Sequence, residues 1–140
     1  MTLVLDSSAT LAWVYADETT AAIRRVFEQV ADDGAIVPAL WRLEVANSLT
    51  IAVRRGRIDA DFRQAALTDL AFLDITADHH TDARAWNETL ALADRFRLTL
   101  YDAAYLELAR RRDLPLATLD RELRNAARAL GVTLLGEAVA

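Results

Sequence analysis

Short apolar runs alternate with longer segments of helical periodicity along the chain, and this alternation restricts the possible folds more than any other feature. The apolar runs predict buried strands over residues 3–6, 35–37, 73–76, 116–118 and 132–135. The segments between them predict helices over residues 8–16, 20–32, 38–55, 59–71, 78–95, 101–112 and 121–130. Strands that alternate with helices are typical of a parallel sheet covered on both faces, so we expect an α/β fold.

Local signals mark several of these boundaries. Pro38 suits the first turn of a helix, and that helix has Arg54 and Arg55 in its last turn and Gly56 directly after it. Asp59 can cap the following helix at its N-terminus. The sequence has no repeat, low-complexity tract or linker, so we expect residues 1–140 to form a single domain.

The composition excludes several classes of function. The absence of cysteine rules out disulfides, thiolate metal sites and cysteine nucleophiles. All sixteen basic residues are arginine, so chemistry that needs a lysine is also excluded. No signal peptide or membrane span is indicated, which predicts a cytoplasmic protein. A net charge of −5 argues against a protein that coats nucleic acid, but an enzyme that holds phosphate through a metal remains compatible with it.

Three aspartates occupy otherwise apolar sequence at the ends of predicted elements. Asp6 is the only charged residue among the first sixteen, and Asp120 closes the apolar run LPLATLD. Asp102 lies at the start of a predicted helix. Each has an ordinary explanation, because aspartate is a favoured N-cap and the helix dipole stabilises an anion in the first turn.

Glu44 is harder to explain by local structure. Its predicted position is the interior of a helix in the apolar segment PALWRLEVANSLTIAV, where neither a cap nor the helix dipole would stabilise it. Arg42 is not at the i+3 or i+4 spacing of a helical partner. A buried acid at this position should be protonated or have a cation nearby.

Together the four acids suggest a metal site. The carboxyl ends of parallel strands meet at one edge of a sheet, so Asp6 and Asp120 are expected there, and Glu44 and Asp102 can converge on the same place. Carboxylates that close would repel one another unless a divalent cation lay among them. Oxygen ligands suit Mg²⁺ or Mn²⁺, and such a site can hydrolyse a phosphodiester.

Three polar residues are weaker candidates for supporting roles. Ser8 and Thr118 flank Asp6 and Asp120 and could bond a carboxylate or a phosphate, although local turn bonding is an equally good explanation. Asn47 lies one turn after Glu44 and could orient it, or it could bond across to a neighbouring element.

The remaining conspicuous residues are interpreted as structural. We expect His79 and His80 on the surface, because neighbouring residues of a helix point about 100° apart and chelate one ion poorly. The three tryptophans are expected in the core rather than stacked on bases. They are Trp13, Trp41 and Trp86. The arginine clusters at 54–57 and 110–112 are expected to be solvated helix ends, with contact to RNA phosphates as the alternative.

The sequence resembles the PIN-domain proteins, and among them the VapC toxins of bacterial VapBC toxin–antitoxin pairs. The resemblance covers almost the whole chain and rests on LVLDSSA, VPALWRLEVANSL and LTLYDAAYLELARRRDLPLATLD, which occur in the family's order and spacing. It implies a three-layer α/β/α sandwich around a central, mainly parallel sheet of about five strands. It also implies an endoribonuclease that depends on Mg²⁺ or Mn²⁺ and acts on structured RNA such as tRNA.

The resemblance also assigns roles and partners. Catalytic and metal-binding roles are carried onto Asp6, Glu44, Asp102 and Asp120, and all four positions match the family pattern. The implied protein is a homodimer that is inhibited, in a higher assembly, by a VapB-type antitoxin covering the acidic groove.

Two other classes remain as alternatives. One is a non-catalytic PIN-like module that uses the groove only to dock a basic partner. The other is a phosphoacceptor receiver domain, which shares the α/β pattern but normally needs a lysine near its aspartate. The absence of lysine ranks the receiver domain last.

Overall fold

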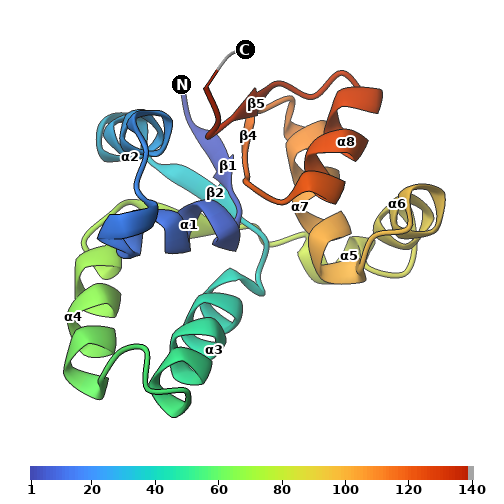
Figure 1. The fold of residues 1–140 in the computed structure, drawn as a ribbon. Helices are drawn as coiled ribbons and strands as arrows, with labels where there is room; N and C mark the ends of the chain where they lie inside the picture. Colours follow the sequence, from blue (N-terminus) through green and yellow to red (C-terminus); the bar gives the residue numbers. More distant parts are fainter. Residues whose placement is uncertain (139–140) are drawn as a thin grey trace.

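The computed structural model describes residues 1–138 and contains one five-stranded sheet in which every strand pairing is parallel (Figure 1). The strands lie in the order β3-β2-β1-β4-β5. Their bounds are Leu3–Leu5 for β1, Ala35–Val37 for β2, Ile75–Ala77 for β3, Leu116–Ala117 for β4 and Leu134–Leu135 for β5. The predicted α/β class with a parallel sheet is therefore confirmed.

The helices fill the connections between successive strands. The first two connections hold α1 (Ser7–Val14), the 3₁₀ turn η1 (Ala16–Glu18), α2 (Ala21–Asp33), α3 (Trp41–Arg54) and α4 (Ala60–Ala71). The last two hold α5 (Thr81–Arg84), α6 (Glu88–Phe96), α7 (Leu100–Arg112) and α8 (Arg121–Ala129). From β1 the chain adds β2 and β3 on one side, and it then returns to place β4 and β5 on the other side of β1. Because the crossovers are right-handed, this reversal places the two sets of helices on opposite faces of the sheet.

Packing contacts agree with this division. Helix α1 packs on α2 and α3, and α3 packs on α4, whereas α7 packs on α6 and α8. Figure 1 shows α1 to α4 and α5 to α8 as two groups separated by the strands. The chain thus forms the expected three-layer sandwich. Its core includes β1 and the central part of α7, where Leu3–Leu5 and Tyr105 are fully buried.

The strand order creates a switch point between β1 and β4. These neighbouring strands begin connections that leave toward opposite faces, and ligands of open α/β sheets bind outside the carboxyl ends of strands at such a point. Leu5 is paired with Ala117 across the two strands. Asp6 and Asp120 follow within three residues of this pair, so the topology brings them to the same edge.

Several local predictions differ from the structure. The helix predicted over 78–95 is two helices, α5 and α6, because Asn87 has a non-helical backbone (φ −115°, ψ −101°) and precedes α6 as its N-cap residue. Pro38 lies in a turn before α3 rather than in its first turn. The cap at Asp59 is confirmed, since its carboxylate accepts a 2.8 Å hydrogen bond from the Phe62 amide.

The tryptophans divide between core and surface. Trp41 is buried, and Trp13 is partly buried and stacks on Phe27 at 4.6 Å between ring centroids. Trp86 was expected in the core but is 86% exposed, because it lies in the turn between α5 and α6 rather than within a continuous helix. His79 and His80 are exposed as expected, although they lie in a turn. Among residues 1–138, no helix has the length and apolar character required to cross a bilayer.

Candidate active site

Asp6 is the most enclosed of the four acids. It lies directly after β1, is only 2% exposed, and caps α1 by accepting a 2.8 Å hydrogen bond from the Ser7 amide. The hydroxyls of Ser8 and Thr118 donate to its second oxygen, Oδ2, at 2.6 and 2.7 Å. Burial raises the pKa of Asp6, and the nearby Asp120 adds to that effect against these three hydrogen bonds.

Asp120 occupies the equivalent place after β4. Its Oδ1 caps α8 by accepting a 2.9 Å hydrogen bond from the Leu123 amide. Its own amide donates to the Thr118 hydroxyl at 3.1 Å. Ser8 accepts in the same way from the Leu119 amide at 2.9 Å. The two hydroxyls therefore join the end of β1 to the end of β4 and fix Asp6 and Asp120 on one framework.

Glu44 lies in the first turn of α3, not in a helix interior as the sequence suggested. The helix begins at Trp41, three residues later than a start at Pro38, so the helix dipole does stabilise the Glu44 carboxylate. The Tyr105 hydroxyl donates to Glu44 Oε1 at 2.6 Å. Burial raises the pKa of Glu44, and repulsion from Asp6 adds to the increase.

Asp102 lies in the first turn of α7, as predicted. Thr99 caps this helix by accepting a 3.1 Å hydrogen bond from the Asp102 amide. Burial and then repulsion from the other three acids raise the pKa of Asp102 to about 6. The structure thus brings all four predicted acids within mutual electrostatic influence.

The supporting residues behave differently from one another. Ser8 and Thr118 contact the Asp6 carboxylate directly, as described above. Asn47 is exposed on α3, and within residues 1–138 it forms no hydrogen bond with Glu44. Tyr105 was missed by sequence reasoning. The available signal was its position three residues after Asp102, which places both on neighbouring positions of one helix surface.

The donor set fits a hard divalent cation. All four acids offer carboxylate oxygens, and a cation would relieve the repulsion that raises the pKa of Asp102. In the described part of the chain, no three acidic or histidine side chains lie close enough together to enclose a metal directly. This spacing suits a cation that keeps part of its water shell, as Mg²⁺ does in proteins.

Comparison with known sequences identifies the class of protein. The sequence model of the PIN domain family matches residues 3–129, which includes all four acids. The chain therefore belongs to the PIN-domain family. It is also 33% identical over 123 residues to "Ribonuclease VapC3" of Pyrobaculum aerophilum, a match that covers 88% of this chain and 92% of that protein. Within the family, the chain is of the VapC type.

Solved structures give the same result for the fold. The crystal structure of PAE2754 from Pyrobaculum aerophilum has 27% identity and a TM-score of 0.66, with 96% of this chain and 92% of that chain covered. VapC20 of Mycobacterium tuberculosis, described as a Sarcin-Ricin loop cleaving toxin, has 16% identity and a TM-score of 0.61. That likeness covers 89% of this chain and 94% of VapC20, and it supports the three-layer fold alone.

Proposed function

We propose that residues 1–140 form a single PIN domain that acts as the toxin of a VapBC-type toxin–antitoxin pair and hydrolyses RNA phosphodiester bonds. The observation that carries the proposal is the convergence of four acids from the ends of β1 and β4 and from the first turns of α3 and α7, where burial and then repulsion from the other three raise the pKa of Asp102 to about 6. Membership of the VapC type supplies the reaction class, because the relative VapC3 is named a ribonuclease.

The acids have distinct proposed roles. Asp6, Asp102 and Asp120 would hold Mg²⁺ or Mn²⁺, directly or through water, and Glu44 would complete the cluster and orient the attacking water. The bound cation would supply positive charge that offsets the phosphate and the charge developing on the leaving oxygen. Tyr105 holds the Glu44 carboxylate in place, and Ser8 and Thr118 hold that of Asp6. Cleavage leaves a 5′-phosphate and a 3′-hydroxyl.

The proposed substrate is structured RNA. VapC20, which shares the fold, is described as cleaving a structured RNA element, the Sarcin-Ricin loop. A tRNA or another folded RNA is therefore the substrate class to test for this chain.

The proposed assembly is a homodimer that binds a VapB-type antitoxin in the cytoplasm. Large apolar side chains are exposed on the turn before α6, on α6 and at the start of α7, and α6 packs on α7. They support a second copy as one partner, since exposed apolar surface of this kind marks protein contacts. They are Trp86 (86% exposed), Leu90 (42%), Leu100 (39%) and Tyr101 (62%).

A cleavage assay with matched variants tests the function. Purified protein freed of antitoxin should cut structured RNA with Mg²⁺ or Mn²⁺ and should stop in EDTA. Asp6→Asn should abolish cleavage. Asp59→Asn is the control, because Asp59 is likewise an aspartate N-cap but belongs to α4, outside the acid cluster. Equal cutting by the wild type in EDTA would falsify the metal-dependent mechanism.

A non-catalytic docking module is the second candidate. It needs only the negative charge of the cluster, because a bound cationic side chain would also relieve the repulsion that helps to raise the pKa of Asp102. Under this alternative the groove binds a basic peptide, and the protein shows neither RNA cleavage nor Mn²⁺ binding by calorimetry. Mn²⁺ binding that Asp102→Asn removes would exclude it.

A further inference from the structure

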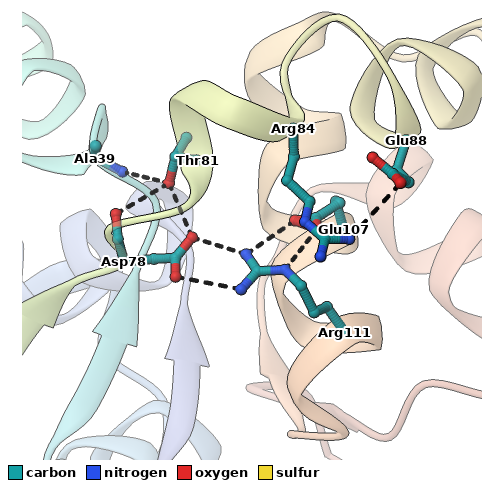
Figure 2. A network of polar contacts seen from close by, with 7 residues as sticks. All are labelled: Ala39, Asp78, Thr81, Arg84, Glu88, Glu107 and Arg111. Atoms are coloured by element: carbon teal, nitrogen blue, oxygen red, sulfur yellow. Dashed lines mark hydrogen bonds and ion pairs between the residues drawn. The ribbon is translucent and has the colours of Figure 1, made fainter.

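A buried ion pair joins the end of β3 to α7, away from the acid cluster. Asp78 follows β3 directly and is 5% exposed. Arg111 of α7 contacts both Asp78 oxygens, with Nη2 at 2.7 Å from Oδ2 and Nη1 at 3.3 Å from Oδ1 (Figure 2). Burial raises the pKa of Asp78, but Arg111, together with hydrogen bonds from the His80 amide and the Thr81 hydroxyl, more than offsets this, and the net pKa lies below its ordinary value. Asp78 is therefore a carboxylate held in one orientation.

Glu107 holds the same arginine from the other side. Arg111 Nε donates to Glu107 Oε1 at 2.7 Å, and Nη2 donates to Oε2 at 3.1 Å. Glu107 is 4% exposed and lies one turn before Arg111 on α7. Arg84 of α5 adds an ion pair with Glu107 at 3.7 Å. Arg84 also pairs with the exposed Glu88 at 3.8 Å, and Arg111 is shared between the two buried carboxylates.

Thr81 extends this network to the start of α3. Its hydroxyl donates a 3.2 Å hydrogen bond to Asp78 Oδ2. The same hydroxyl accepts a 3.1 Å hydrogen bond from the Ala39 amide. Ala39 lies two residues before α3 begins at Trp41. Figure 2 shows Thr81 placed between Ala39 and Asp78, so the contacts run without a gap from the turn before α3 to α7.

The two segments joined in this way are the ones that carry Glu44 and Asp102. Glu44 is five residues after Ala39, and Asp102 is nine residues before Arg111 on the same helix. The only other polar link that the structure shows between α3 and α7 within residues 1–138 is the Tyr105–Glu44 hydrogen bond. A helix held at one point can still pivot about it, whereas a helix held at two separate points cannot.

We propose that Asp78, Thr81, Glu107 and Arg111 form a brace that sets the distance and angle between Glu44 and Asp102, and so positions the acids for a divalent cation. The inference rests on the proposed function, since it concerns the cation that the acids would hold. Members of the brace are positioning residues that touch neither RNA nor the acids themselves.

The energetics favour a positioning role over a purely stabilising one. Buried ion pairs add little to stability compared with apolar residues of the same size, because removing two charges from water opposes their attraction. Their geometric demand is strict, however, because a guanidinium shared by two carboxylates satisfies both only in one arrangement. Groups that hydrogen-bond metal ligands directly typically change metal affinity by about 10- to 100-fold when lost, and the brace, which is one step further from the cation, should have an effect at the lower end of that range.

Calorimetric titration of the metal-free protein with Mn²⁺ tests the brace without relying on catalysis. Asp78→Asn removes the charge that Arg111 contacts, and Thr81→Val removes the hydroxyl that reaches Ala39. Each should weaken Mn²⁺ binding by about 10-fold. The double variant should weaken it by less than the product of the two single effects, because both break one continuous chain of contacts.

A control that lowers stability at another site separates positioning from general destabilisation. Asp59→Ala removes the N-cap of α4, whose carboxylate bonds the Phe62 amide and takes no part in the brace, and should lower the unfolding midpoint while leaving Mn²⁺ binding unchanged. In cleavage assays, excess Mn²⁺ should restore the brace variants, and their KM for RNA should match the wild type.

The outcomes distinguish the brace from the function it serves. Weaker Mn²⁺ binding in both brace variants but not in Asp59→Ala is the expected result. Normal binding by the wild type together with equal binding by all three variants would overturn the brace alone. A wild type that binds no Mn²⁺ would overturn the proposed function and the brace with it.

Discussion

Replacing Asp102 with asparagine should stabilise the metal-free protein while it abolishes metal binding. Asp102 is partly buried, and its pKa is raised to about 6 by burial and by repulsion from Asp6, Asp120 and Glu44. At neutral pH the folded state therefore holds a carboxylate that would be more favourably charged in the unfolded chain. Asparagine keeps the size of the side chain and removes the charge, so the repulsion disappears.

The size of the effect follows from the pKa. A rise from 3.8 to about 6 corresponds to at most about 3 kcal/mol, at about 1.4 kcal/mol for each unit of pKa. Solvent at this partly exposed position screens the repulsion, and asparagine loses about 0.3–1 kcal/mol of favourable interaction with the α7 dipole. The free energy of unfolding should therefore increase by about 1–2 kcal/mol.

The pH dependence has a definite sign. Below pH 3.8 Asp102 is protonated in both the folded and the unfolded state, so it carries no charge that opposes folding. Between pH 3.8 and about 6 the unfolded chain loses this proton first, so its contribution to wild-type stability falls as the pH rises. Above pH 6 the penalty is constant. The increase in the free energy of unfolding caused by Asp102→Asn should accordingly be present at pH 8 and nearly absent at pH 4.

Urea unfolding in EDTA at pH 4 and pH 8 measures both the gain in the free energy of unfolding and its dependence on pH. The matched control is Asp94→Asn on α6, which changes the same net charge at an exposed position outside the acid cluster. If Asp102→Asn were less stable than the wild type at pH 8 without metal, the carboxylate would have a structural role and the electrostatic reasoning would be refuted. An equal gain at pH 4 would contradict the assigned pKa.

Three further results are expected. Tyr105→Phe should lower the free energy of unfolding, measured in urea, by about 1–2 kcal/mol and the rate of RNA cleavage by about 10-fold or more, since Glu44 loses its hydrogen bond while the ring still packs. Unchanged cleavage would show that Tyr105 is not part of the site. Thr118→Val should cost about 1–3 kcal/mol in the same assay, because the buried Asp6 carboxylate loses a donor; a neutral result would show that Ser8 suffices. Trp86→Ser should shift the protein toward the monomer in analytical ultracentrifugation, and an unchanged mass would place the dimer contact elsewhere.

The fold was predictable because its strands carry their signal locally. Buried parallel strands are apolar throughout, and each lies between helices that end at recognisable residues, such as the Asp59 cap. Predictions failed where the decisive information was tertiary. Nothing in the pattern over 78–95 distinguishes one helix from two, and α5, which ends just before the turn that exposes Trp86, is held by tertiary contacts such as the ion pair of Arg84 with Glu107.

The positions of the candidate acids were predictable, but the groups that hold them were not. Asp6, Asp102 and Asp120 stand out because each is a charge at the end of an apolar element. Tyr105 does not stand out, because a buried tyrosine on a helix resembles any other core residue. The brace was equally hidden, since Asp78 and Arg111 are 33 residues apart in the sequence and meet only through the packing of α7.

Helix capping and metal binding were competing explanations for the aspartates in the sequence, and the structure makes them compatible. A carboxylate has about four acceptor positions, and Asp6 accepts four hydrogen bonds, from the Ser7 amide and from the hydroxyls of Ser7, Ser8 and Thr118, the one from the Ser7 hydroxyl being the longest at 3.5 Å. The Asp6 carboxylate is therefore held in a fixed direction, and only the long bond from the Ser7 hydroxyl is easily given up to another ligand. Asp120 uses only one, for the Leu123 amide, among the contacts of residues 1–138. The caps therefore orient these carboxylates at the edge of the sheet, and the free acceptor positions leave Asp120 with more capacity than Asp6 to hold a cation or its water.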